Sequence, residues 1–383
     1  MSLRRIYLDH AATTPVDPEV IRAMTPYFGE RFGNASSLHW FGREAERAIS
    51  DAKRAISKKV DAKEHRLIFT SGGTESNNLA LKGVAFANRE RGKHIITSRI
   101  EHDCVLNASK WLQKQGFEVT YLPVDRHGFV RPDDLENAIR KDTIIASIIH
   151  ANNEIGTIEP IRELGKICRE HGVCFHTDAC QSFTKVPINL KKDNIDLLTV
   201  NSHKIHGPKG VGGLFVRQGV RIEPTMHGGG HEYGLRSGTE NVAGIVGFAK
   251  ATEIMNDKHI RHMTDLRDMI IKEALEIEDS WLNGPAKERL CNNAHFSFRR
   301  IEGESLIIHL DLKGIATSTG SACSSKSLEP SHVLMAIGLK PEEAHGSMRI
   351  SLGKENTKEE VEYLLENLTE AVETLRKISP FKK

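Results

Sequence analysis

The chain has 383 residues, and 53 Lys and Arg against 51 Asp and Glu leave a formal net charge of only +2. The two signs are interspersed, so no basic stripe indicates a nucleic-acid or anionic-membrane partner. No apolar run reaches the roughly 20 residues of a spanning helix, and the first residues lack the apolar region of a signal peptide. We therefore expect a soluble, cytoplasmic protein that binds neither nucleic acid nor a membrane. This length also predicts two domains.

The order of elements indicates the fold class. A short strand-like run, Ile6–Leu8, and a turn at Pro15 and Pro18 precede a helix over 40–60 whose apolar residues recur on one face. Seven short β-rich runs follow, mostly separated by stretches with helical periodicity: Leu67–Thr70, His94–Ser98, Glu118–Leu122, Ile144–Ile149, Val173–Thr177, Asp196–Val200 and Gly213–Val216. This alternation predicts an α/β fold with a mainly parallel, seven-stranded sheet covered by helices. We assign residues 15–255 to this large domain.

The alternation weakens after about residue 250. Long amphipathic helices over roughly 256–277 and 357–377 bracket shorter strands over 294–298 and 348–352. Residues 1–14 and 256–383 are therefore predicted to form a smaller α+β domain.

One lysine follows the strand predicted over Asp196–Val200. Asn201-Ser202-His203-Lys204 continues the chain, and Gly207-Pro208-Lys209-Gly210 cannot continue a helix, so Lys204 lies at a strand exit on constrained backbone. Active-site groups are common at such places. A lysine there can form an imine with a carbonyl when desolvation or a nearby cation favours its neutral amine. On this stretch alone, an ordinary solvated lysine is the alternative.

Two further segments follow predicted strands, where the ligands of parallel sheets collect. Thr70-Ser71-Gly72-Gly73-Thr74 opens a helix, so its N–H groups and the Thr74 hydroxyl can bind a phosphate or simply cap the helix. The glycine spacing is neither a P-loop nor G-x-G-x-x-G, which disfavours a nucleotide. Asp178 ends a buried strand, where a carboxylate needs a cationic partner such as a pyridinium nitrogen. A metal held by His176 and Asp178 is the alternative.

The six cysteines are too few for a disulfide framework, and none forms a Cys-x-x-Cys pair, which fits a reducing cytoplasm. Five of them lie in or beside helix-like or strand-like patterns, and we interpret these five as structural: Cys104, Cys168, Cys174, Cys180 and Cys291. Cys323 lies in the loop-like run Thr-Gly-Ser-Ala-Cys-Ser-Ser-Lys, which favours a reactive thiol over a small buried apolar side chain.

With these motifs in this order, the sequence resembles the cysteine desulfurases of the pyridoxal-phosphate-dependent class V aminotransferase superfamily, in the branch that supplies iron–sulfur assembly. The resemblance runs nearly end to end, from Tyr7-Leu8-Asp9-His10-Ala11-Ala12-Thr13-Thr14-Pro15 to Arg349-Ile350-Ser351. It implies the type I fold of pyridoxal-phosphate-dependent transferases and conversion of L-cysteine to L-alanine. It also implies a homodimer that passes sulfur to an acceptor protein, such as an iron–sulfur scaffold, and that also serves tRNA thiolation.

The resemblance implies a role for each matching residue. Lys204 would hold the cofactor and act in catalysis, His102 would stack on its ring and act in catalysis, and Asp178 would contact the pyridine nitrogen. Residues implied to contact the phenolic oxygen and its surroundings are Gln181 and Asn153. Residues implied to form the phosphate site are Gly73, Thr74, Asn201, Ser202, His203 and, from the other subunit, Thr239. Arg349, with Asn153, would bind the substrate carboxylate, and Cys323 would accept the sulfur. No metal ligand is implied.

Three positions depart from the family pattern. Asn201 stands where many relatives carry Ser, Ala35 replaces a usual Pro, and Gly73 replaces a frequent Ala. None of these changes removes a catalytic group. Two alternatives stay open: a selenocysteine lyase or aminotransferase of the same superfamily, although Cys323 argues against a transaminase, and a non-catalytic scaffold that binds a metal or cluster.

Overall fold

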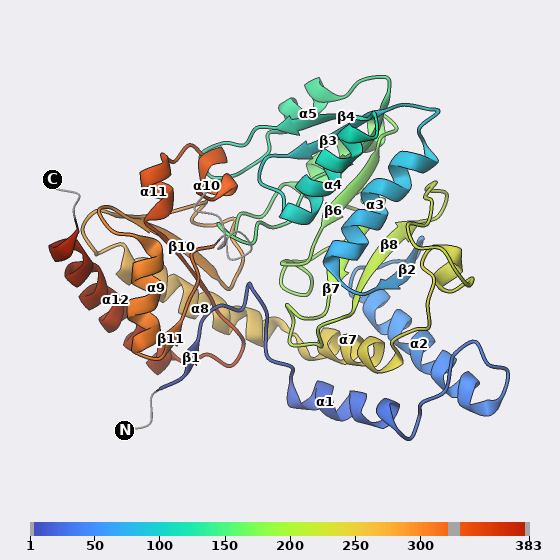
Figure 1. Cartoon of the computed structure of the whole chain (residues 1–383), viewed down its shortest axis with the longest axis horizontal. Coiled ribbons are helices and arrows are strands. Elements are labelled where there is room, and N and C mark those ends of the chain that lie inside the picture. Colours follow the sequence, from blue (N-terminus) through green and yellow to red (C-terminus); the bar gives the residue numbers. More distant parts are fainter. Residues whose placement is uncertain (1–3, 321–329, 380–383) are drawn as a thin grey trace.

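The computed structural model describes residues 4–320 and 330–379. Its largest sheet has seven strands in the order β2-β8-β7-β6-β5-β3-β4 (Figure 1). The strands are β2 (His65–Thr70), β3 (His94–Ser98), β4 (Glu118–Leu122), β5 (Thr143–Ser147), β6 (Cys174–Asp178), β7 (Leu197–Asn201) and β8 (Gly212–Arg217). Only β8 runs against its neighbours, β7 and β2. The α/β class, the mainly parallel sheet and all seven predicted strands are confirmed.

The strands of this sheet are buried on both faces. Along β2, Leu67 and Phe69 pack into one apolar cluster and Ile68 into a second one on the opposite face. The helices that cover the sheet and flank it are α1 (Pro18–Met24), η1 (Thr25–Phe28), α2 (Trp40–Lys58), α3 (Gly73–Ala87), α4 (Asp103–Lys114), α5 (Pro132–Ala138), α6 (Ile161–Glu170), η2 (Glu232–Gly234) and α7 (Val242–Ile254). Burial on two faces explains why the strands read as short, nearly continuous apolar runs.

The remaining strands form two small sheets beside the large one, on the left of Figure 1, where all of them except the blue β1 have orange to red colours. One joins β1 (Ile6–Tyr7) to β11 (Ile315–Ala316) in parallel, and the other has the order β12-β10-β9. Its strands are β9 (Ser280–Leu282), β10 (Asn293–Phe298) and β12 (Ser347–Ser351). The helices of this part are α8 (Asp257–Ala274), α9 (Gly303–Leu312), α10 (His332–Ala336), α11 (Pro341–His345) and α12 (Lys358–Ile378). The predicted helices 256–277 and 357–377 correspond to α8 and α12.

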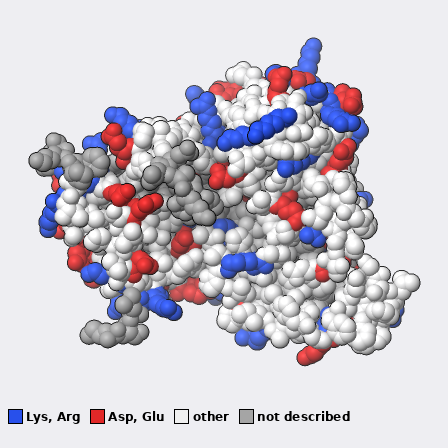
Figure 2. Space-filling view, viewed as in Figure 1, with Lys and Arg blue, Asp and Glu red and all other residues white. Residues whose placement is uncertain are grey.

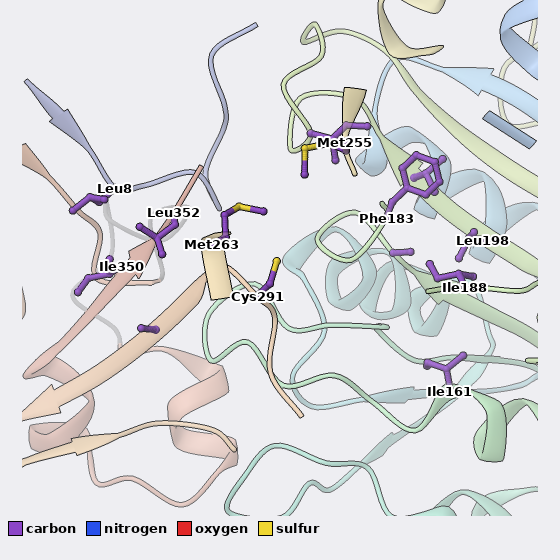
Figure 3. Packing of buried hydrophobic residues seen from close by; sticks show 14 of the residues in the cluster. Leu8, Ile161, Phe183, Ile188, Leu198, Met255, Met263, Cys291, Ile350 and Leu352 are labelled. Atoms are coloured by element: carbon purple, nitrogen blue, oxygen red, sulfur yellow. The ribbon is translucent and has the colours of Figure 1, made fainter. Parts of the chain in front are cut away.

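One apolar cluster joins the small sheets to the large one. Figure 3 shows it running from Ile350 and Leu352, through Met263, to Phe183 and Leu198. The two parts are therefore packed through a common core, and the domain boundaries at 15–255 and at 1–14 plus 256–383 stay a prediction. Across residues 4–320 and 330–379, no helix combines the length and the apolar character needed to cross a membrane.

Candidate active site

A cavity of about 520 Å³ lies where the carboxyl ends of β6 and β7 meet the small sheets. Most of the residues predicted for the site line it: Gly73, Thr74, His102, Asn153, Asp178, Gln181, Asn201, His203, Lys204 and Arg349. Because these residues come from six separate stretches of the chain, their convergence is a property of the fold. The carboxyl edge of a parallel sheet is the place where such convergence is expected.

Lys204 follows β7 and faces the N-terminal segment. Its Nζ donates hydrogen bonds to the carbonyls of Ala11 and of Ala12, the second at 2.7 Å. The same segment holds the lysine loop, since the Thr14 hydroxyl donates to the His203 carbonyl at 3.0 Å. Burial, and next the positive charge of Arg349, lower the pKa of Lys204 to about 8. An amine with this pKa is partly neutral near neutral pH and is therefore available as a nucleophile or a base.

Asp178 lies at the end of β6, and only 4% of it is exposed. Its Oδ1 accepts the Cys180 backbone N–H at 2.8 Å, and its Oδ2 accepts the Asn77 side-chain N–H at 2.6 Å. Both of these donors are neutral. A buried carboxylate that faces a cavity with neutral partners is suited to pair with a cationic group in the cavity, such as a protonated heterocycle.

The N-terminus of α3 lies at another part of the wall. Its N-cap, Gly72, offers no side chain to cap the helix, so the first N–H groups remain for an anion. A Cβ on Gly73 would lie 2.5 Å from the Cys180 sulfur. This contact gives a physical reason for glycine at this position. The nearby Asn201 side chain has a buried Oδ1 without a partner among the described residues.

The imidazole of His203 lines the cavity, with its Nδ1 3.1 Å from the Thr13 hydroxyl oxygen. Burial, then the charges of Lys204 and Lys209, lower the pKa of His203 to about 4. Two other residues predicted for the phosphate site do not line the cavity. Ser202 is fully buried, with its Oγ beside Gly207, and Thr239 lies on the exposed surface.

Arg349, on β12, is held by three acceptors. Its Nη2 pairs with Asp9 at 2.8 Å, and its Nη1 donates to the carbonyls of Asn153 at 3.0 Å and Gly320 at 3.2 Å. The Nε is buried and has no partner among residues 4–320 and 330–379. The guanidinium is thus fixed in the cavity wall and retains a donor for a carboxylate.

The cysteines differ in part from their structural interpretation. Cys168 and Cys291 are buried, but Cys104 and Cys180 line the cavity. Asn77 also lines it and was missed, although it lies four residues after Gly73 and so on the same face of α3. Cys323 lies outside the described residues.

The metal-binding alternative rested on His176 and Asp178. In the structure, the two ring nitrogens of His176 lie 2.8 Å from the Ser147 hydroxyl and 3.0 Å from the Thr199 hydroxyl. Within the described ranges, no group of three or more His, Cys, Asp or Glu side chains is arranged to hold a metal ion.

Comparisons with known proteins agree with this geometry. A family model described as "Aminotransferase class-V" matches residues 6–364. The chain is 56% identical over 384 residues to "Cysteine desulfurase IscS" of Dictyoglomus turgidum, covering 99% of this chain and 98% of that one. Identity to the protein of the same name from Methanosarcina thermophila is 53%, covering 98% and 94%.

Solved structures give the same picture. A "NIFS-LIKE PROTEIN" superposes with a TM-score of 0.91 at 39% identity, covering 97% of this chain and 100% of that one. "SspA in complex with cysteine" superposes with a TM-score of 0.83 at 38% identity, covering 92% of this chain and 100% of that one.

Proposed function

This chain belongs to the class-V aminotransferase family, whose members depend on pyridoxal phosphate, and we propose that it is a cysteine desulfurase that converts L-cysteine to L-alanine. Two relatives with more than half of their residues identical carry that activity in their names, and a solved relative holds cysteine. The observation that carries the proposal is that Lys204, Asp178 and Arg349 line one cavity.

The cavity wall fits pyridoxal phosphate. The buried Asp178 carboxylate suits the protonated ring nitrogen, the uncapped N-terminus of α3 suits the phosphate, and the low pKa of Lys204 suits attachment to an aldehyde. When bound, this cofactor supplies an aldehyde that condenses with amines and a ring that withdraws electrons from the amino acid.

The chain's own residues divide the remaining work. Arg349 binds the substrate carboxylate through N–H groups that have no acceptor in the described protein, such as Nε. Asn153, whose carbonyl accepts from Arg349, helps to shape this end of the cavity. The Lys204 amine, partly neutral near pH 8, takes up and returns a proton at Nζ. Gln181 donates to the Ala11 carbonyl at 2.9 Å, the acceptor that Lys204 also uses, so Gln181 helps to fix the segment against which the lysine lies.

Cys323 is proposed as the thiol that accepts the sulfur. Its thiolate attacks the sulfur of L-cysteine, an S–S bond forms, the substrate C–S bond breaks, and protonation of the carbon product gives alanine. The balance is L-cysteine plus Cys323 thiol giving L-alanine plus Cys323 persulfide. Gly320 and Pro330, the described residues on either side of 321–329, both line the cavity, which supports this role. The persulfide would pass to an acceptor such as an iron–sulfur scaffold protein.

A homodimer is part of the proposal. Large apolar side chains are exposed from the end of η1 to the first residue of α2: Phe28 at 71%, Phe32 at 64%, Leu38 at 93% and Trp40 at 59%. Figure 2 shows few charged side chains in this lower-right part of the surface. Such a patch is typical of a protein interface. Thr239 is exposed and lies outside its own cavity, which supports its use by a second copy of the chain. The five described cysteines are all free, which supports a reducing, cytoplasmic location.

The test is direct. The purified protein, loaded with pyridoxal phosphate, is given L-cysteine, and alanine and protein-bound persulfide are measured. We expect equal amounts of both in a single turnover, and borohydride should fix the cofactor to Lys204. Alanine without persulfide, or cofactor fixed to Lys209 in place of Lys204, would contradict the proposal. The two related activities are tested by replacing L-cysteine in the assay. Selenocysteine tests a selenocysteine lyase, and a keto acid with an amino donor tests an aminotransferase.

A further inference from the structure

The Cys104 thiol lies in the cavity wall between His102, which the family resemblance places over the cofactor ring, and Asn77, which contacts Asp178. Its Sγ is 3.0 Å from Nδ1 of His102 and accepts a hydrogen bond from Nδ2 of Asn77 at 3.1 Å. The same Nδ2 donates to Asp178 at 2.6 Å. A continuous chain of hydrogen bonds therefore runs from His102 through Cys104 and Asn77 to Asp178.

The direction of each hydrogen bond follows from the donors. His102 is the N-cap of α4, and its Nδ1 accepts the backbone N–H of Cys104 at 3.2 Å. A ring nitrogen that accepts a hydrogen bond carries no proton, so the proton between Nδ1 and Sγ belongs to sulfur. The neutral ring then carries its own proton on Nε2. Cys104 thus donates to His102 and accepts from Asn77.

The orientation of the Asn77 amide is equally constrained. Asn77 is fully buried, and its Oδ1 has no partner among residues 4–320 and 330–379. The reversed orientation would place this oxygen 2.6 Å from the Asp178 carboxylate and would leave the sulfur without its donor. The observed orientation uses one N–H for the carboxylate and the other for sulfur. The Asn77 amide is therefore fixed by two contacts, one with Asp178 and one with Cys104.

We propose that Cys104 is a positioning residue of the cofactor site, which holds His102 as a neutral ring with its proton on Nε2 and holds the Asn77 amide that orients Asp178. This inference rests on the proposed function, because it assigns the two ends of the hydrogen-bonded chain to the face and to the nitrogen of the cofactor ring. Cys104 touches residues that touch the cofactor and takes no part in sulfur transfer.

The competing interpretation makes Cys104 a second nucleophile. A cysteine beside a histidine is reactive when it transfers its proton and becomes a thiolate next to an imidazolium. That transfer would put a proton on Nδ1, where the backbone N–H of residue 104 already points. The geometry therefore favours a thiol that keeps its proton.

The experiment compares Cys104→Ala and Cys104→Ser with Cys168→Ala, which removes a buried thiol from α6, outside the cavity. Two quantities are measured: the affinity of cofactor-free protein for pyridoxal phosphate, by fluorescence titration, and kcat and KM for L-cysteine. Loss of one hydrogen-bonded link corresponds to about a fivefold to tenfold effect. We expect Cys104→Ala to lose that factor in cofactor affinity and in kcat, with KM little changed. Ser should restore most of both, since a hydroxyl can donate to Nδ1 and accept from Asn77.

Two results would overturn the inference. Cys104→Ala could match the Cys168→Ala control in both quantities, which would leave the link without a role. Alternatively, Cys104→Ser could be as inactive as a variant that lacks the sulfur acceptor, which would mean that sulfur itself reacts. Failure of the proposed function can be told apart from failure of this inference. If the wild-type protein makes no alanine, the affinities of the wild type and the Cys104 variants for pyridoxal phosphate still test the role of Cys104.

Discussion

Replacement of Gly73 by alanine should be harmful only while Cys180 is present. The added Cβ would lie 2.5 Å from the Cys180 sulfur, whereas its next neighbours, in Asn201 and Thr199, are at 3.6 and 3.9 Å. Nonbonded heavy atoms of this size are comfortable at about 3.5 to 4.0 Å, so the sulfur or the start of α3 must move by about 1 Å. Overpacking of this kind costs about 1 to 3 kcal/mol. In a Cys180→Ala background this contact is absent. Alanine in place of Gly73 should then stabilise the protein by about 0.4 to 1 kcal/mol, because it lowers the conformational entropy of the unfolded chain.

The assay is a double-mutant cycle of the wild type, the two single variants and the double variant. Urea unfolding of the cofactor-free proteins should give a coupling energy of about 2 to 3 kcal/mol between positions 73 and 180. Because Gly73 begins the helix that we propose for phosphate binding, cofactor affinity should follow the same pattern. A loss of about 2 kcal/mol corresponds to roughly 30-fold weaker binding in Gly73→Ala alone. Equal losses in both backgrounds would refute the steric explanation.

Three further predictions concern the lysine, the dimer and the sulfur acceptor. In cofactor-free protein, the rate of reductive methylation of Lys204 should rise through about pH 8, because the lowered pKa leaves more of the amine neutral. Arg349→Gln should move this rise to higher pH, because it removes a nearby cation. The same pH dependence in the variant and the wild type would contradict the electrostatic argument. The double variant Leu38→Glu, Trp40→Glu should sediment as a monomer, since a charge in a buried interface is costly. It should also bind the cofactor at least about tenfold more weakly than the wild type. A wild-type protein that is monomeric and fully active would exclude the shared site. Cys323→Ser should keep the cofactor spectrum but form no persulfide and almost no alanine, whereas alanine at the wild-type rate would mean that sulfur leaves by another route.

The sheet was predictable because its strands are buried on both faces. Ile68 packs on one side of β2 while Leu67 and Phe69 pack on the other, and this arrangement leaves short apolar runs in the sequence. The reversed direction of β8 was not predictable, because an apolar pattern is the same in either direction along the chain. Its partners, β2 and β7, become visible only through the hydrogen-bond register.

The site was predictable where a polar residue lies at the end of a strand or within a few residues after it. Lys204 and Asp178 lie at such places, and both line the cavity. Asn77 and Cys104 lie on helices, where a polar or small side chain has many ordinary explanations, and their significance depends on distances across the fold. The Arg349 ion pair with Asp9 joins opposite ends of the chain, so no local pattern could indicate it.

These long separations affect how the protein is made. The lysine amine bonds to a carbonyl 193 residues earlier in the chain, and Arg349 pairs with a carboxylate 340 residues earlier. During synthesis on the ribosome, the N-terminal segment cannot contact the lysine loop until that loop has been made. The substrate end of the cavity is completed only after β12 has left the exit tunnel. A chain that stops before β12 would therefore lack Arg349 at the substrate end of the cavity. We expect such a chain to convert no L-cysteine to alanine, because it would lack the arginine proposed to bind the substrate carboxylate.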